Sequence, residues 1–375
     1  MRICIDIRWL QYVKTGIGKY TLNLLKALSA IDNSNEYIMF YNDPNRQGPD
    51  DLPAAPNFKL ITAHWPHNLL RATWAYTNFP AMERFVGRID LLHALGFQVP
   101  PTSKAVKVFT VYDLVPLTHP QLVPQSKFGI KRPRFKFHAT RADMVVAISQ
   151  ATANEAKRLL ELPDEKVAVV YPGTISIVRA GDDAIGEMKK KFGLLRNYML
   201  FVSTIDPKKN LPRLMRAFEQ SELAGAYDLV LVGPPGWYME ETFSTREELS
   251  CKKHIYWLKY VSDSDLSALY SGASFFVYPS LLEGFGLPIF EAMSVGCPVL
   301  TSNVSSMPEA AGEAAVYVNP YEIDSVAEGL KRIAGDKKLR EKLSRMGLER
   351  VSQFSWENAA RQMIEVYKRA SEIKK

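Results

Sequence analysis

The chain has 375 residues, which is enough for two domains of ordinary size. Hydrophobic residues make up 47% and charged residues 23%, a composition typical of a soluble globular protein with a hydrophobic core. No apolar run approaches the roughly 20 residues that cross a bilayer, which argues against a membrane-spanning protein. The net charge of +7 is compatible with acidic partners such as nucleotides or a membrane surface. No zinc-finger, leucine-zipper or aromatic RNA-binding signature accompanies it, so we expect no nucleic acid partner.

The N-terminal residues and the cysteines both indicate a cytoplasmic protein. Met1–Ile7 predicts a first buried strand rather than a secretory leader. The cysteines, Cys4, Cys251 and Cys297, are odd in number and far apart, which favours reduced thiols over disulfides. We therefore expect a cytoplasmic location.

The first half of the chain alternates apolar strands with helices. We expect strands at Arg2–Ile7, Tyr37–Tyr41, Phe58–Thr62, Asp90–His93, Val106–Val111, Met144–Ile148 and Val167–Val170. Helices are predicted at Gly18–Ala30 and at Gln150–Glu161, the second with Ser149 as its N-cap. This alternation is typical of a mostly parallel sheet with helices on both faces.

A second series of the same kind follows a looser, charge-rich segment at 175–193, which we interpret as a linker. We expect its strands at Tyr198–Ser203, Leu229–Val232, Ile255–Trp257, Ser274–Tyr278 and Val299–Thr301. Ser262 and Asp265 resemble a capping box before a helix at Leu266–Ser271. Three helical stretches end the chain, the last at about Trp356–Ile373. The sequence thus predicts two similar α/β halves.

One segment of the second half, LLEGFGLPIFEAMSVGCPVL at 281–300, has the pattern of an anion site. It follows a buried strand, and Pro288 suits the first turn of a short helix that Gly296 and Pro298 end. In a parallel sheet such a turn lies at the carboxyl edge, where ligands bind. Gly284 and Gly286 let the backbone approach a phosphate, and the N–H groups of residues 285–289 can bind a diphosphate.

Two glutamates, Glu283 and Glu291, flank this glycine turn. An ionised carboxylate only accepts hydrogen bonds, so its natural partner beside a phosphate is a pair of vicinal hydroxyls. We expect Glu283 to accept hydroxyls of a transferred sugar and Glu291 to accept those of a ribose. The alternative is that Glu291 only favours the helix dipole and that Glu283 is solvated.

These residues resemble a known family. Glu283 to Glu291, E-G-F-G-L-P-x-x-E, is similar to the E-x7-E signature of retaining glycosyltransferases of family 4, which have the GT-B fold. Nearly the whole chain shares the resemblance, and the ordered set of motifs is far more specific than any single one. The other matching stretches are Thr15–Tyr20, Tyr112–Leu117, Ala142–Ser149, Val202–Asn210 and Ser302–Gly312.

The resemblance implies an α/β protein of GT-B fold with two Rossmann-like domains facing across a cleft. It implies an acceptor-binding domain at residues 1–175 and a nucleotide-sugar-binding domain at 190–355. The final helix, 356–373, is then expected to cross back to the first domain. The same resemblance implies a UDP- or GDP-linked sugar donor.

Lys208 and Lys209 lie in a loop between a strand and a helix, at the same sheet edge as Glu283. An ammonium group there stabilises the negative charge that grows on a departing diphosphate. The family's matching lysine is Lys209, and Lys208 takes the place of an arginine that the family often has where this chain has Thr204. A solvated basic turn is the alternative.

The first half of the chain contains weaker candidates for site residues. Gly16 and Gly18, between the first strand and the first helix, are expected to let the domain close on the diphosphate. Tyr112 replaces a histidine that the family commonly has before Asp113, and a phenol cannot act as an imidazole. For Asp113 a catalytic role and a structural turn role both stay open.

The stretch from Gln121 to Arg141 contains no acidic residue and mixes basic with aromatic side chains. The basic residues are Lys127, Lys131, Arg132, Arg134, Lys136 and Arg141, and the aromatic ones are Phe128, Phe135 and Phe137. This combination predicts contact with an anionic membrane surface, at the inner face of the membrane. An ordinary helix with buried aromatic rings is the alternative.

The predicted activity is transfer of a hexose from a nucleoside-diphosphate sugar to a glycan or lipid-linked acceptor, in polysaccharide or glycolipid synthesis. The catalytic candidates are Lys209, Glu283 and Asp113. The candidates for binding the sugar donor are Gly16, Gly18, Lys208, Lys209, Glu283, Gly284, Phe285, Gly286, Leu287 and Glu291.

No cofactor or metal is expected, since no zinc motif, Walker loop or nucleophilic triad is visible and the H-x-x-H pair His64 and His67 has no third ligand. The alternatives are a noncatalytic nucleotide-sugar-binding protein, or another GT-B enzyme such as an epimerase or phosphorylase. A Rossmann dehydrogenase is less consistent with the sequence, because no G-x-G-x-x-G follows the first strand.

Overall fold

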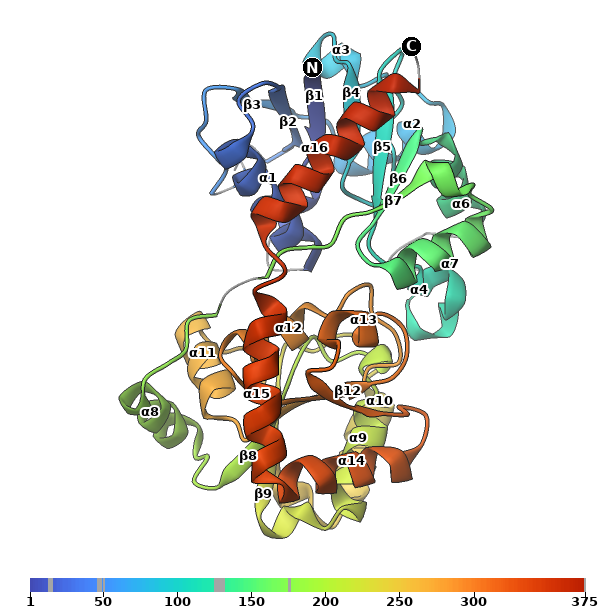
Figure 1. Cartoon of the computed structure of the whole chain (residues 1–375). Helices are drawn as coiled ribbons and strands as arrows, with labels where there is room; N and C mark the ends of the chain where they lie inside the picture. The colour runs from blue at the N-terminus through green and yellow to red at the C-terminus, as the bar shows by residue number, and fades with distance from the viewer. Residues whose placement is uncertain (13–15, 46–48, 50, 125–131, 175–176, 374–375) are drawn as a thin grey trace. The chain divides into compact units, whose positions relative to one another are not determined.

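The computed structural model describes residues 1–12, 16–45, 49, 51–124, 132–174 and 177–373 (Figure 1). The chain forms two compact units. Unit 1 contains Met1–Thr118, Gln125–Gly173 and Phe354–Lys375, and unit 2 contains His119–Pro124 and Thr174–Gln353. Thr15, Lys127, Phe128 and Lys131, which the sequence motifs included, lie outside the described residues, as do the side chains of Arg132 and Arg134.

Unit 1 contains a seven-stranded parallel sheet of order β3-β2-β1-β4-β5-β6-β7. Its strands are β1 (Arg2–Asp6), β2 (Glu36–Asn42), β3 (Phe58–Ala63), β4 (Leu91–Ala94), β5 (Val106–Val111), β6 (Met144–Ala147) and β7 (Val167–Val169). Its helices are α1 (Gly16–Ile31), α2 (His67–Tyr76), α3 (Glu83–Val86), α4 (Val115–Thr118), α6 (Arg132–Arg141), α7 (Gln150–Leu160) and α16 (Trp356–Glu372).

The buried strands and the helix cap of unit 1 agree with the prediction from the sequence. The central strands are buried on both faces, as a parallel sheet covered by helices requires. Ser149 caps α7, since its side chain accepts a hydrogen bond from the Thr152 N–H. Gly16 and Gly18, however, form the first turn of α1 instead of the loop before it. Our prediction of the start of this helix was therefore wrong by two residues.

The last helix, α16, belongs to unit 1 although the helix before it belongs to unit 2 (Figure 1). Gly173 makes this return possible, because a Cβ there would lie 2.2 Å from the backbone nitrogen of Trp356. Within unit 1, α16 packs against α1, and the Trp356 ring meets the Tyr20 ring edge-on at 5.3 Å. The predicted return of the final helix is confirmed.

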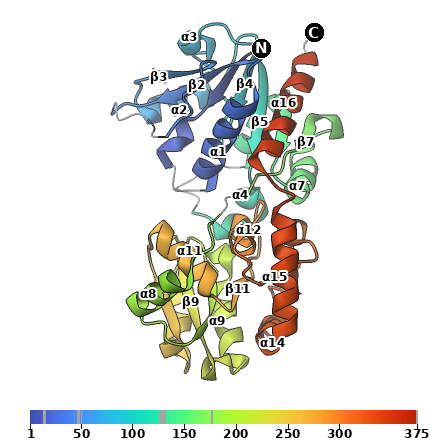
Figure 2. The same cartoon turned by 60° about the vertical axis from the view of Figure 1, so that its left-hand side comes forward.

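Unit 2 contains a six-stranded parallel sheet of order β10-β9-β8-β11-β12-β13 (Figure 2). Its strands are β8 (Asn197–Val202), β9 (Tyr227–Val232), β10 (Ile255–Leu258), β11 (Phe275–Tyr278), β12 (Val299–Ser302) and β13 (Ala315–Val318). Its helices are α8 (Asp182–Phe192), α9 (Leu211–Gln220), α10 (Glu240–Glu248), α11 (Asp263–Gly272), α12 (Leu287–Ser294), α13 (Met307–Ala311), α14 (Ile323–Gly335) and α15 (Lys337–Val351). The predicted α/β class with two Rossmann-like sheets is confirmed.

Two elements of unit 2 differ from the prediction. The segment interpreted as a loose linker contains α8, which packs against α11 and ends at Gly193 in the left-handed conformation that glycine tolerates. Only Met188 of this helix is buried, and its sequence, DDAIGEMKKKF, is rich in charged residues. Strand β13, at the edge of the sheet, was not predicted, although its four residues alternate between half-buried and buried. The predicted cap at Ser262 is present, accepting from the Asp265 N–H.

Candidate active site

The candidate site lies where β8, β11 and β12 of unit 2 end, at the carboxyl edge of the sheet. Hydrogen bonds join the loops that follow these strands. The Leu281 N–H donates to the Lys208 carbonyl at 2.8 Å, and the Ser306 hydroxyl donates to the Glu283 carbonyl at 2.9 Å. Ser305, at a φ of 58°, accepts from the Glu283 N–H and donates to the Glu283 carbonyl. The loops therefore form one ordered surface at the edge where parallel sheets bind ligands.

The first loop turns the Lys209 side chain inward. Asp206 caps a short 3-10 turn at Pro207–Lys209 by accepting from the Lys208 N–H. Asn210 then takes the left-handed conformation, with a φ of 62°, and its side chain donates to the carbonyls of Pro279 and Pro320. Helix α9 starts directly afterwards at Leu211. This turn buries Lys209, of which only 5% is exposed.

Lys209, Tyr278 and Glu283 form a buried triad. The Lys209 Nζ lies 2.5 Å from Glu283 Oε1 and 2.7 Å from the Tyr278 hydroxyl. The Tyr278 hydroxyl donates to the same Glu283 oxygen at 2.9 Å, and Lys208 Nζ lies 3.8 Å from Glu283 Oε2. A buried ion pair is stable only with such additional hydrogen bonds, because both ions have lost their water. Sequence reasoning placed both charged residues at this edge but did not predict that they pair.

The electrostatics of the triad keep Glu283 ionised. Burial disfavours its charged form, but Lys209 and Lys208 and the hydrogen bonds from Lys209 and Tyr278 outweigh burial and lower its pKa to about 2. Burial raises the pKa of Asp206 above its ordinary value, although the same two lysines oppose the rise. Two ammonium groups thus lie close to the firmly ionised Glu283, and both also act on the carboxyl group of Asp206. A diphosphate can compete with Glu283 for the lysines, because it carries more negative charge than one carboxylate.

The glycine turn leads from Glu283 into α12. Gly286 has a φ of 102°, a conformation that favours glycine, and Pro288 occupies the first turn as predicted. Among the described residues, the N–H groups of Gly286 and Leu287 have no hydrogen-bond acceptor. The predicted set of available amides is smaller than expected, because the Ile289 N–H bonds the Gly286 carbonyl. Gly284 and Phe285 are buried, with the Phe285 ring against that of Phe290.

Glu291 lies on α12, one turn after Leu287, and is buried. Tyr270 of α11 donates its hydroxyl to Glu291 Oε2 at 2.9 Å. A ribose at this position would therefore share the carboxylate with a phenol. The structure brings Glu283, Lys208 and Lys209 together and places Glu291 on α12, and each glutamate accepts a hydrogen bond from a tyrosine.

The candidates of the first half lie in unit 1. Asp113 accepts from the Val115 N–H at 3.2 Å, the contact expected of a turn residue that starts α4. Tyr112 is buried and donates to the Leu95 carbonyl at 3.1 Å. Gly16 has no atom of another residue near its missing Cβ among the described residues, so space alone does not require glycine there.

Sequence reasoning missed three residues of the site, Tyr278, Ser305 and Ser306. Tyr278 ends β11, so the strand prediction already placed it at the sheet edge, although nothing in the sequence indicated its two partners. The serines act through the Glu283 backbone, and their role depends on β11 and β12 being neighbours.

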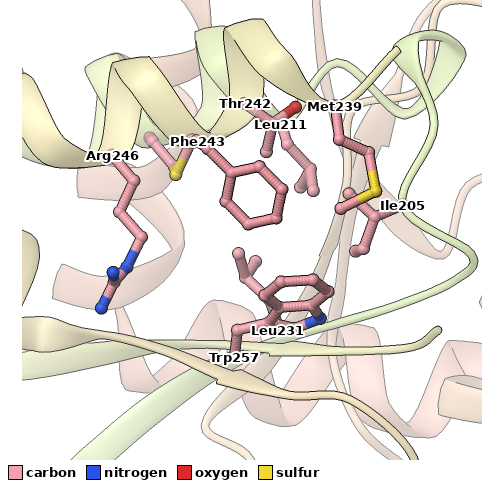
Figure 3. A pocket seen from close by; sticks show the side chains of 9 residues that line it. Ile205, Leu211, Leu231, Met239, Thr242, Phe243, Arg246 and Trp257 are labelled. Atoms are coloured by element: carbon pink, nitrogen blue, oxygen red, sulfur yellow. The ribbon is translucent and has the colours of Figure 1, made fainter. Parts of the chain in front are cut away.

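An apolar cavity in unit 2 is too small to bind a substrate (Figure 3). It lies between α9, α10 and the strands β9 and β10, and its volume is about 20 Å³, room for about one water molecule. Figure 3 shows the rings of Phe243 and Trp257 facing this space, and their centroids lie 5.2 Å apart. We interpret it as a packing defect.

Within the described ranges, no three side chains among the histidines, cysteines and acids gather as metal ligands would. His64 and His67 instead contact Asp43 and Asn42. In the same ranges, no helix has both the length and the apolar character that crossing a bilayer requires.

Comparison with known proteins places the chain in a family. The model described as Glycosyltransferase Family 4 matches residues 14–175, and the model described as Glycosyl transferases group 1 matches residues 186–350. The O-antigen chain mannosyltransferase B of Escherichia coli is 29% identical over 388 residues, which cover 98% of this chain and 100% of that protein.

Solved structures show the same fold at lower identity. Sucrose-phosphate synthase from Thermosynechococcus elongatus has a TM-score of 0.78 and 21% identity, with 98% of each chain covered. Anabaena HepE, solved in complex with UDP-glucose, has a TM-score of 0.72 and 16% identity over 98% of this chain and 99% of its own. The chain therefore has the GT-B fold and belongs to family 4 of the glycosyltransferases.

Proposed function

We propose that the protein is a retaining mannosyltransferase that moves mannose from a nucleoside-diphosphate donor to a glycan on a lipid carrier, during polysaccharide synthesis. The observation that carries this proposal is the buried triad of Lys209, Tyr278 and Glu283 at the carboxyl edge of unit 2. The choice of mannose follows the relative from Escherichia coli, a mannosyltransferase that matches along the whole chain.

In this proposal the two lysines bind the diphosphate. A diphosphate brings more negative charge than the Glu283 carboxylate, so Lys209 exchanges its contact with Glu283 for a phosphate oxygen. Lys208, whose Nζ lies 3.8 Å from the same carboxylate, joins it, and the N–H groups of Gly286 and Leu287 complete the anion site. As the bond to the sugar breaks, the ammonium groups stabilise the charge on the leaving group.

The freed Glu283 carboxylate then accepts the sugar hydroxyls, and Glu291 accepts the ribose hydroxyls beside Tyr270. Before the donor binds, the two lysines hold the pKa of Glu283 at about 2, so the carboxylate enters the reaction ionised and as a hydrogen-bond acceptor. The departing phosphate oxygen takes the acceptor proton. The bond from the sugar C1 to the phosphate breaks and the bond from C1 to the acceptor oxygen forms on the same face, which gives retention.

Residues of unit 1 belong to the acceptor side of the proposal. Asp113 is the catalytic candidate there, and Gly16 and Gly18 are the candidates for close approach of the diphosphate. Unit 2 supplies the charge stabilisation. No metal ion is required, because the lysines and amides supply the positive charge.

The test is to incubate the purified chain with GDP-mannose, UDP-glucose and UDP-galactose, with and without a lipid-linked acceptor. The expected result is release of the nucleoside diphosphate from GDP-mannose together with an α-linked mannosyl product. Thermal stabilisation by a sugar nucleotide without product would favour the noncatalytic alternative. A changed sugar nucleotide, or a sugar phosphate as product, would favour an epimerase or a phosphorylase.

A further inference from the structure

Unit 1 exposes large apolar side chains on helix α2 and on the loop that follows it. Leu69 is 51% exposed, Tyr76 is 79% exposed and Phe79 is 61% exposed. Leu69 and Tyr76 are seven residues apart, so they lie on the same flank of the helix, while Leu70 and Trp74 face the core. Because single exposed apolar residues are ordinary, only their grouping needs an explanation.

Helix α6 extends this group. The Phe137 ring on α6 is 38% exposed, and the Arg141 guanidinium lies 4.8 Å from its centroid. Arg141 also donates a hydrogen bond to the Asn78 side chain, next to Phe79, so the two segments meet. We call the set Leu69, Tyr76, Phe79, Phe137 and Arg141 the α2–α6 surface; Figure 1 labels both helices in unit 1.

The sequence segments that carry this surface are poor in acidic residues. The sequence has no acidic residue between Asp51 and Glu83, nor between Asp113 and Asp143. Lys136 of α6 is neutralised by Glu161 at 2.7 Å, so it adds little. Arg141, by contrast, has no carboxylate within ion-pair distance in the described part of the chain. The surface therefore combines exposed aromatic rings with an uncompensated positive charge.

We propose that the α2–α6 surface binds the surface of an anionic lipid bilayer. Aromatic side chains favour the interface between headgroups and hydrocarbon, and arginine is attracted to anionic headgroups. An acidic protein partner would match the charge, but it would not need rings exposed over both segments. The inference rests on the proposed function only in that a lipid-linked acceptor lies at such a surface.

The experiment is co-sedimentation of the full chain with vesicles of phosphatidylglycerol and phosphatidylcholine, and with vesicles of phosphatidylcholine alone. We expect binding to the anionic vesicles that falls as salt is raised. A Tyr76→Ser and Phe79→Ser double variant should bind at least about tenfold more weakly. Arg141→Gln should bind about fivefold more weakly. The matched control is Leu195→Ser, which removes an 86% exposed apolar side chain from unit 2 and should bind as the wild type does.

Equal binding by the double variant and the wild type would overturn the proposal, as would equal binding to both kinds of vesicle. Concentration-dependent dimerisation that the double variant loses would also overturn the proposal, because it would show that a second copy of the chain covers this surface. Turnover with a soluble acceptor separates this inference from the proposed function. Vesicle binding without turnover would contradict the proposed function alone. Turnover without vesicle binding would contradict the membrane role of the α2–α6 surface alone.

Discussion

The carboxyl edges of the two sheets have the same architecture but different chemistry. At the edge of unit 1, the Asp6 carboxylate forms a two-point pair with Arg8, and the Tyr112 hydroxyl bonds a backbone carbonyl. At the edge of unit 2, Lys208 and Lys209 lie beside Glu283, and both also act electrostatically on the buried Asp206. The first arrangement joins one guanidinium to one acid, whereas the second offers two lysine ammonium groups that a phosphate can bind. The difference shows that the loops, and not the fold, determine where this chemistry lies.

Asp32 and Glu283 have the same lowered pKa for different reasons. Asp32 in unit 1 and Glu283 in unit 2 are both buried, and both have a pKa of about 2. For Asp32, hydrogen bonds from Tyr37, Asn35 and Ser34 outweigh burial. For Glu283, the two lysines outweigh the effect of burial on the pKa. A lowered pKa alone therefore does not mark a functional site; the identity of the partner does.

The largest expected effect is that of Lys209→Ala. Removing the ammonium group that stabilises the leaving diphosphate should lower turnover about 1000-fold. The measurement is release of the nucleoside diphosphate at a temperature where circular dichroism shows the variant folded. The control is Lys191→Ala, which breaks an exposed ion pair with Asp265 in the same unit and should leave turnover unchanged. Turnover of Lys209→Ala within threefold of the wild type would place the chemistry elsewhere.

Glu283→Gln should lower turnover about 100-fold, because an amide of the same shape has one acceptor oxygen instead of two and carries no charge. The matched control is Asp32→Asn in unit 1. It should lower the melting temperature but not the turnover of the folded protein. If both variants lose turnover equally, the comparison between the two acids fails.

The stability of the fold should depend on pH through Glu283. Its pKa is about 2 in the folded chain against an ordinary 4.5, so the carboxylate stabilises the fold above pH 4.5 and this contribution is lost as the pH falls through 2. The full contribution is about 3 kcal/mol. Urea unfolding of the wild type and of Glu283→Gln should differ by about 2 kcal/mol less at pH 3 than at pH 5. A difference that does not change with pH would contradict the pairing with Lys209.

A smaller effect is expected for Tyr278→Phe. The phenol orients Lys209 and Glu283 without reacting, so its loss should lower kcat about tenfold and leave KM for the sugar donor nearly unchanged. Steady-state kinetics of the variant and the wild type measure kcat and KM separately. A rise in KM with kcat preserved would instead mean that Tyr278 contacts the bound donor.

The smallest effect is expected for Tyr112→Phe. The lost hydrogen bond to the Leu95 carbonyl should cost about 1 kcal/mol of stability. Turnover should stay within about twofold, because catalysis changes little unless a group acts on the transition state. A large loss of turnover in a stably folded variant would give the edge of unit 1 a chemical role.

The sequence predicted every strand but β13, and the glycine turn, because their signals are local. Hydrophobic runs define the buried strands, and Gly286 and Pro288 define the start of α12. The contact of Lys209 with Glu283 joins residues 74 apart, and it depends on β8 and β11 being neighbours, which local pattern does not reveal. Helix α8 was missed although its apolar residues recur at helical spacing, because we interpreted its charge-rich composition as that of a linker.

The most direct test of the central claim, that Lys209 of unit 2 exchanges its contact with Glu283 for the donor diphosphate, is calorimetric titration with GDP and UDP. The wild type and Lys209→Ala should differ at least about tenfold in affinity for the nucleotide that binds, because one charged contact to the diphosphate is lost. Tyr112→Phe should bind that nucleotide as the wild type does. Equal affinity of the wild type and Lys209→Ala would contradict the account.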